Sequence, residues 1–118
     1  MNYSNPTSIQ IIASSATAKL IDAGVPSKPL GAAPRLRTAD FLLHGQTAEA
    51  GIWECEAGSF RRQVARPEVM HLLQGRCTFQ VDGELPVEFV AGDSFFFPGN
   101  TQGTWEIIET VRKLYVIL

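Results

Sequence analysis

GDSFFFPGNTQGTW, residues 92–105, links two apolar runs through a single sharp turn. Its three consecutive phenylalanines favour a pleated, half-buried surface. Pro98 and Gly99 then interrupt that surface, because Pro and Gly are the strongest local breakers of regular structure. A further apolar run opens at Gly103. The stretch therefore predicts a strand, a turn and a second strand.

The chain after residue 38 has the same texture throughout. Short apolar or alternating runs recur at intervals of roughly 8 to 12 residues, as in all-β sandwiches and barrels. The predicted strands are residues 41–43, 51–55, 69–73, 77–81, 87–90, 94–97, 104–108 and 111–118. Asp82-Gly83 between two of these runs predicts a hairpin, since glycine tolerates a positive φ. About eight short strands favour an all-β jelly roll or barrel, which protects its edges.

Residues 1–38 have a different composition. They are rich in Ser, Ala and Pro, with prolines at positions 6, 26, 29 and 34. Because proline lacks an N–H donor and biases its predecessor toward extended conformations, we expect an extended segment along the surface. A short helix over about residues 16–22, capped by Ser15, is an alternative for part of it. The predicted organisation is an N-terminal segment, residues 1–38, and one domain, residues 39–118.

Composition argues against several classes of partner. Twelve acidic and ten basic residues give a net charge of −2, whereas nucleic-acid binding calls for a basic patch and a high pI. No run approaches the roughly 18 apolar residues of a membrane span, and the N-terminus lacks the apolar region of a secretion signal. We therefore expect a cytoplasmic protein that binds neither nucleic acid nor membrane. Cys55 and Cys77 lack a metal-binding spacing and are expected to be buried free thiols.

Five motifs occur in one order along the second part of the chain. They are GIWEC at 51–55, EVMHLLQGR at 68–76, GDSFFFPG at 92–99, GTWE at 103–106 and ETVRKLY at 109–115. In these motifs the chain resembles the cupins, and within them the small subgroup that includes the ureidoglycine aminohydrolase and ethanolamine-utilisation cupins. The resemblance covers about residues 38–118. It implies an RmlC-like double-stranded β-helix, which is a jelly-roll barrel, and a homodimer.

The resemblance also implies where a metal would be held. The general cupin pattern has two His and a Glu in its first motif and one His in its second. Carried onto this sequence, the Glu falls on Glu68 and the second-motif His falls on Gly103. The remaining two positions lack an imidazole, being Arg62 and Val64, or Arg61 and Gln63 if the spacing is one residue longer. One carboxylate is a poor ligand set, so we expect no metal cofactor, although a weak divalent site that uses the Gln102 amide stays open.

The family register implies which side chains face the barrel interior, because alternate residues of a strand face opposite sides. The predicted ligand-binding residues are Arg62, Val64, Glu68, Met70, Gln102 and Trp105. On this interpretation the Arg62 guanidinium holds a carboxylate through two parallel hydrogen bonds, and Trp105 forms a wall. The alternatives are an ordinary exposed pair of Arg61 and Arg62 at the barrel mouth, and a Trp105 that only packs the core. His71 follows Glu68 by three residues and so should face away from it.

Three functions stay open on the sequence alone. The first is a small-molecule-binding cupin with a degenerate metal site, whose partner is a small polar or carboxylate-bearing metabolite. The second is an enzyme, such as an aminohydrolase or isomerase, in which Glu68 acts as acid or base on a small nitrogenous or sugar-like metabolite. The third is a structural or interaction protein with a filled barrel. We favour the first, because the histidine ligands are missing.

Overall fold

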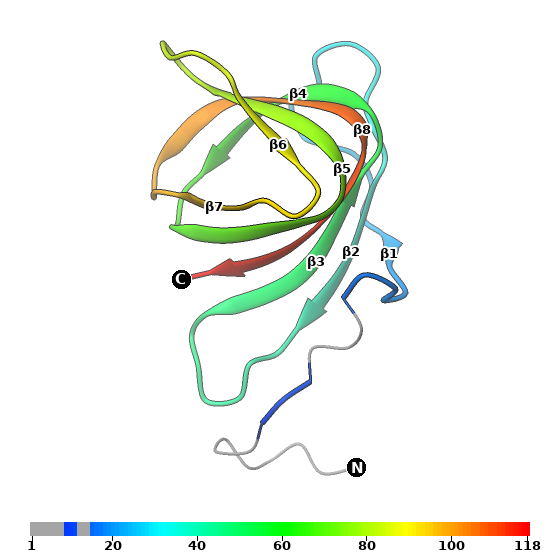
Figure 1. Ribbon diagram of the computed structural model, residues 1–118, viewed down its shortest axis with the longest axis vertical. Coiled ribbons are helices and arrows are strands. Elements are labelled where there is room, and N and C mark those ends of the chain that lie inside the picture. Colours follow the sequence, from blue (N-terminus) through cyan, green and yellow to red (C-terminus); the bar gives the residue numbers. More distant parts are fainter. Residues whose placement is uncertain (1–8, 12–14) are drawn as a thin grey trace.

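The computed structural model describes residues 9–11 and 15–118, and within them it is all-β, with antiparallel strands and no helix. The strands are β1 (Ile21–Asp22), β2 (Leu36–Phe41), β3 (Glu49–Cys55), β4 (Gly58–Val64), β5 (Glu68–Val81), β6 (Val87–Val90), β7 (Ser94–Phe97) and β8 (Thr101–Ile117). Figure 1 shows them curled into a barrel, with the β2–β3 loop projecting below it. The predicted all-β jelly-roll architecture is confirmed. The described residues include no helix long and apolar enough to cross a membrane.

Two long strands, β5 and β8, organise the sheet. β8 pairs with β5 along most of its length, with β3 near its C-terminal end and with β4 near its N-terminal end. β5 in turn pairs with β6 and β7. Register shifts between Leu72 and Cys77 mark an irregularity in the β5–β8 ladder. Bulges of this kind bend a strand and increase its twist, which helps the sheet to curl around a central space.

The predicted strand boundaries are wrong in two respects. Residues 69–73 and 77–81 belong to one continuous strand, as do residues 104–108 and 111–118. Gly75 lies inside β5 with a φ of +90°, and a Cβ there would lie 2.1 Å from the backbone oxygen of Thr110. Gly75 therefore lies in a β-bulge within β5 and not in a turn between two strands. The strand β4 was not predicted at all, because its sequence, GSFRRQV, is polar over its second half.

The predicted helix over about residues 16–22 is also wrong. Residues 15–17 form a turn, and β1 follows and pairs with β2. Arg112 of β8 anchors this segment, because its Nη1 donates to the carbonyl oxygens of Ala16 at 2.9 Å and Ala18 at 3.1 Å. Hydrogen bonds to a distant strand thus take the place of the helical ones.

The two predicted turns are confirmed. Asp82-Gly83 joins β5 to its antiparallel partner β6, and Gly83 has a φ of +82°. Residues 98–100 join β7 to β8, and Asn100 lies in the left-handed region with a φ of +62°. The stretch of residues 92–105 therefore contains a strand, a turn and the start of a second strand, as predicted.

Aromatic side chains pack together inside the barrel. Phe89 stacks on Phe95 with 3.9 Å between ring centroids. Trp105 packs against Phe79 and Phe97, with centroid separations of 4.9 and 5.5 Å. Such pairs contribute about 0.5–1.5 kcal/mol each beyond the apolar area that they bury. We call these five residues the aromatic cluster.

The two cysteines are buried and free, as predicted. Burial raises the pKa of the Cys55 thiol to about 12 and that of the Cys77 thiol to about 11. Both thiols are therefore protonated and act as small apolar side chains of the core.

Candidate functional site

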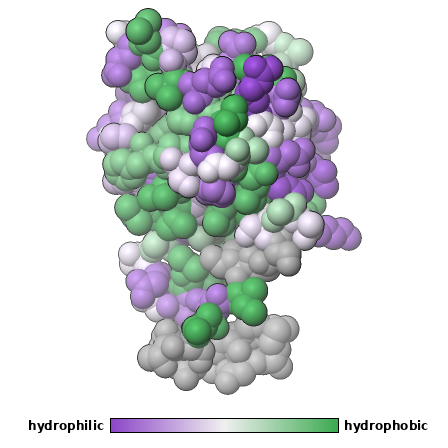
Figure 2. Space-filling view, viewed as in Figure 1, coloured by the Kyte–Doolittle hydropathy of each residue, from purple (hydrophilic) through white to green (hydrophobic). Residues whose placement is uncertain are grey.

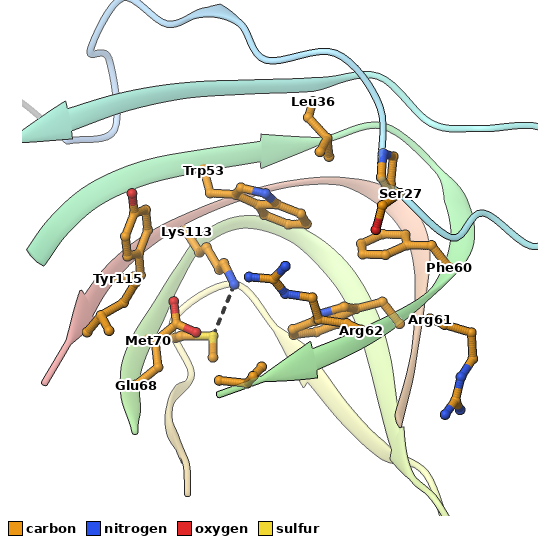
Figure 3. Close-up of a pocket in the computed structure, with 14 residues that line it drawn as sticks. Ser27, Leu36, Trp53, Phe60, Arg61, Arg62, Glu68, Met70, Lys113 and Tyr115 are labelled. Atoms are coloured by element: carbon orange, nitrogen blue, oxygen red, sulfur yellow. Dashed lines mark hydrogen bonds between the residues drawn. The ribbon is translucent and has the colours of Figure 1, made fainter. Parts of the chain in front are cut away.

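A cavity of about 200 Å³ lies beside the aromatic cluster, and Trp105 contributes to both. Strands β3, β4, β5 and β8 supply most of its lining. The side chains that define it are Trp53, Phe60, Arg62, Glu68, Trp105 and Lys113. Figure 3 shows polar ends from three of these strands turned toward a common space. The barrel is thus not filled, contrary to what the third function requires.

All but one of the predicted ligand-binding residues line this cavity. They are Arg62, Val64, Glu68, Met70 and Trp105. Gln102 does not line it, because it lies opposite Gln63 in the β4–β8 ladder and borders a neighbouring depression. Gln102 and Glu68 are therefore not in the lining of one cavity. That the five lining residues bind a ligand stays a prediction.

Lys113 is not among the residues predicted for the site, yet its amine lies in the cavity wall. Lys113 is only 6% exposed. Its Nζ donates to Sδ of Met70 at 3.1 Å and lies 4.6 Å from the ring centroid of Trp53 and 5.1 Å from that of Trp105. The motif that contains it was interpreted only as a final strand. Strand alternation gave a usable signal, since the buried Val111 lies two residues earlier on the same face.

The protonation of Lys113 is set by competing effects. Burial lowers the pKa of its amine, the charge of Glu68 opposes that shift and the charge of Arg62 adds to it. The two indole faces favour the ammonium form, but such contacts contribute only about 0.5–2 kcal/mol. Desolvation of a buried ion costs several kcal/mol. Burial therefore dominates, and the pKa of Lys113 lies below its ordinary value.

Strand alternation separates the two neighbouring arginines of β4. Arg61 turns outward, where its Nη1 and Nη2 donate to the two carboxylate oxygens of Asp82, both at 2.6 Å. These hydrogen bonds hold the pKa of Asp82 below its ordinary value. Arg62 turns its guanidinium toward the cavity and toward Lys113, as Figure 3 shows. Both arginines border the cavity, but the Arg61 guanidinium is held by Asp82, so of the two it is Arg62 that turns its donors toward the cavity.

Tyr115 completes the wall on the side of β2. Its hydroxyl donates to Oδ1 of Asp40 at 3.0 Å. Burial raises the pKa of the Tyr115 hydroxyl most, and the Asp40 carboxylate raises it further. Gly51 of β3 makes room for the ring, since a Cβ at this position would fall 2.4 Å from the Tyr115 hydroxyl oxygen. The phenol is thus fixed as a neutral group in the wall.

The EutQ-like cupin domain family matches residues 42–115. The chain belongs to this family. The cupin resemblance inferred from the five motifs is therefore confirmed, whereas the ureidoglycine-aminohydrolase-like subgroup is not established by this match.

Solved structures agree with the EutQ-like cupin at the level of the fold. Ethanolamine utilisation protein Q (EutQ) of Salmonella typhimurium superposes with a TM-score of 0.64 and 24% identity, over 70% of this chain and 68% of that chain. A protein of unknown function from Pseudomonas syringae pv. tomato gives a TM-score of 0.79 at 21% identity, over 87% of this chain and 46% of that chain. At these identities the likeness concerns the fold alone.

One curated relative matches part of this EutQ-like cupin. It is a pyrimidine/purine nucleoside phosphorylase of Nocardia farcinica, which is 44% identical over 47 residues. The match spans 39% of this chain and 46% of that protein. The chain thus matches less than half of that relative's length.

The cavity of this EutQ-like cupin does not fit the metal that the general cupin pattern implies. A Cβ at Gly103 would lie 2.2 Å from the Gln80 backbone oxygen and 2.6 Å from a ring carbon of Phe79. Position 103 therefore has no room for a side chain. No cluster of three or more potential His, Cys, Asp or Glu ligands occurs in the part of the chain that the structure describes. Glu68 instead shares its cavity with basic side chains, among them Arg62 and Lys113.

The two histidines lie outside this cavity lining. His71 of β5 makes a 2.7 Å hydrogen bond between its Nδ1 and the hydroxyl oxygen of Ser94. His44 lies in a turn between β2 and β3. The predicted orientation of His71, away from Glu68, agrees with this placement.

Proposed function

We propose that this EutQ-like cupin binds a small carboxylate-bearing metabolite in its barrel cavity. The observation that carries the proposal is the convergence of the Arg62 guanidinium and the Lys113 amine on one cavity. A planar guanidinium matches a carboxylate through two parallel hydrogen bonds. The indole faces of Trp53 and Trp105 supply apolar walls for the rest of the ligand.

The volume of the cavity supports a small ligand. Sites for drug-sized molecules and cofactors are usually about 300–1,000 Å³, whereas this cavity has about 200 Å³. A compact acid of a few carbon atoms fits these limits better than a nucleoside with its sugar. The partial match to a nucleoside phosphorylase nevertheless makes nucleosides with phosphate a useful comparison in a binding panel.

The test compares two adjacent arginines. Small carboxylic acids, amino acids, ureides, sugar acids and nucleosides with phosphate are screened by thermal shift and by NMR titration. Arg62→Gln should weaken binding of the acids by at least about tenfold, the effect of losing roughly 1.4 kcal/mol from a charge-assisted pair. Arg61→Gln is the matched control and should bind normally, because the Arg61 guanidinium is held by Asp82. The proposal would be refuted if the two variants lost affinity for the acids equally, or if no compound in the panel showed saturable binding.

A second candidate is an enzyme in which Glu68 acts as general acid or base on a small nitrogenous or sugar-like metabolite. It is favoured by one observation, the carboxylate of Glu68 held 7% exposed at the cavity. Ureides belong in the panel because of the resemblance to ureidoglycine aminohydrolase cupins. Loss of turnover in Glu68→Gln with unchanged ligand affinity would support this role, and unchanged turnover would refute it.

We further propose that the protein forms a homodimer. Val69 of β5 and Phe96 of β7 are neighbours in register and are 43% and 54% exposed. Figure 2 shows apolar surface on the face of the molecule that carries these strands. Exposed apolar patches often mark interaction surfaces. Light scattering should give the mass of a dimer, and Phe96→Glu should shift it toward that of a monomer.

A further inference from the structure

We propose that Lys113 captures a small oxo acid covalently, by forming an imine between its Nζ and the carbonyl carbon of the ligand. The inference rests on the proposed function, because the carboxylate of the oxo acid is the group that Arg62 holds. It goes further by naming the chemical class of the ligand and the atom that reacts with it.

The surroundings of Nζ suit a nucleophilic amine. The amine is buried, and its nearest partners are the thioether of Met70 and two aromatic rings. Within the described residues it forms no ion pair within 4.0 Å with Glu68 or any other carboxylate. An ammonium without such a partner is expensive to bury, so burial favours the uncharged amine. That direction agrees with the lowered pKa of Lys113, and the free amine is the form that attacks carbonyl groups.

The position of Lys113 in the cavity distinguishes it from a core lysine. Nζ borders the open volume that Arg62 and Glu68 also line. An oxo acid held by Arg62 would present its carbonyl carbon, next to the carboxylate, to this part of the cavity. Glu68 lines the same space and is available to relay protons. The three groups come from β4, β5 and β8, so the arrangement depends on the closed barrel.

The reaction balances without an oxidant or a metal. The lone pair of Nζ forms a bond to the carbonyl carbon, and the carbonyl π electrons move to oxygen, which takes up a proton while nitrogen gives one up. The resulting carbinolamine loses its hydroxyl group with a proton as water, and a C=N bond forms. The sum is amine plus carbonyl compound giving imine plus water. Glu68 can accept the proton from nitrogen and return it to the departing hydroxyl.

The experiment uses the full chain with pyruvate or glyoxylate as the probe and sodium cyanoborohydride as the trap. Reduction converts an imine into a stable secondary amine, which intact mass and peptide mapping then locate. The chain has three lysines. Lys19 and Lys28 are exposed and report non-specific modification within the same molecule. We expect Lys113 to be modified faster than either exposed lysine, because burial lowers the pKa of its amine and leaves more of it in the reactive uncharged form.

Lactate, which lacks the carbonyl group, separates this inference from the proposed function. Arg62-dependent binding of lactate and pyruvate with a trapped adduct on Lys113 supports both. The same binding with adducts only on Lys19 and Lys28 overturns the imine and leaves the binding function standing. If neither acid binds and no adduct forms on Lys113, both fall. Lys113→Met should abolish the adduct at this position, with circular dichroism as the check on its fold, but the wild-type mapping decides the question without it.

Discussion

The ring of Phe79 occupies the space that a side chain at position 103 would need. An added Cβ on Gly103 would lie 2.6 Å from a ring carbon of Phe79, and Phe79 itself packs edge-on against Trp105. Gly103 therefore lies against the aromatic cluster. It stands at the position where the general cupin pattern carries its second-motif histidine. The histidine ligand is missing at position 103, and the ring of Phe79 fills the space that it would need.

Gly103→His should destabilise the protein and should not restore metal binding. The new side chain meets both Phe79 and the Gln80 backbone oxygen, and overpacking of this kind costs about 1–3 kcal/mol. Urea unfolding monitored by tryptophan fluorescence measures the loss. Gln102→His is the matched control, because this neighbouring side chain is exposed and its replacement should change stability by about 0.5 kcal/mol or less. A rise in melting temperature of Gly103→His on addition of Mn²⁺ or Zn²⁺ would contradict the expectation.

Two glycines with similar backbone angles should respond differently to substitution by alanine. Gly75 and Gly83 have φ values of +90° and +82°, so each variant bears the left-handed strain of about 1–2 kcal/mol. At Gly83 nothing lies within 4 Å of the new Cβ, whereas at Gly75 the Thr110 oxygen lies 2.1 Å away. Gly75→Ala should therefore lose a further amount of about 1–3 kcal/mol. Equal losses in chemical denaturation would show that the β5 bulge relaxes freely.

Lys113→Met should flatten the dependence of stability on pH. Because the folded pKa of Lys113 is lowered below 10.5, the unfolded chain binds more protons between the lowered pKa and 10.5. In that window the free energy of unfolding rises with pH, by at most about 1.4 kcal/mol per pH unit. The advantage of the Met variant should therefore be largest at low pH and shrink as pH rises toward 10.5, in urea titrations that begin at about pH 6 and extend to 10.5. Parallel curves for the two proteins would contradict a lowered pKa.

The thiols have the opposite effect in the upper part of that pH range, and they do so in both proteins. The folded pKa values of Cys55 and Cys77 are raised from 9.0, so above that pH the folded chain holds the extra protons and stability falls. The charges that act on Lys113 come from Glu68 and Arg62 as well as from these cysteines. Lys113→Met leaves the carboxylate and the guanidinium in place, so the difference between the two curves isolates the amine.

Cys55 and Cys77 should resist alkylation in the folded protein. A shift of the pKa from 9.0 to about 11 or about 12 lowers the thiolate fraction near neutral pH by at least about a hundredfold, and burial adds a steric barrier. Labelling with iodoacetamide, followed by mass spectrometry, should therefore be slow in buffer. In concentrated urea both thiols should react at the rate of a model peptide. Rapid labelling of either one in the native state would show that the core opens locally.

The fold was predictable because local chemistry agrees with it. Asp82-Gly83 and the turn at residues 98–100 interrupt apolar runs, and the structure places the β5–β6 hairpin at the first and the β7–β8 connection at the second. β4 escaped prediction because Arg61, Arg62 and Gln63 hide its alternation, and its apolar Phe60 and Val64 are too few to show a period. The single strand β5 is predicted as two, residues 69–73 and 77–81, because a glycine in a bulge, here Gly75, and a glycine in a turn look alike in sequence.

Three features could be predicted from the sequence: the alternation of strands and turns, the match to the cupin motifs and the absence of the histidine ligands. Each of them depends only on residue type and short-range spacing. Only the tertiary structure decided which groups share the cavity. Met70 and Lys113 are 43 positions apart and meet through a hydrogen bond inside the barrel, and Phe79 reaches the place of Gly103 across the β5–β8 ladder. Such meetings depend on the register of paired strands, which is fixed when the sheet closes and its inner faces pack together.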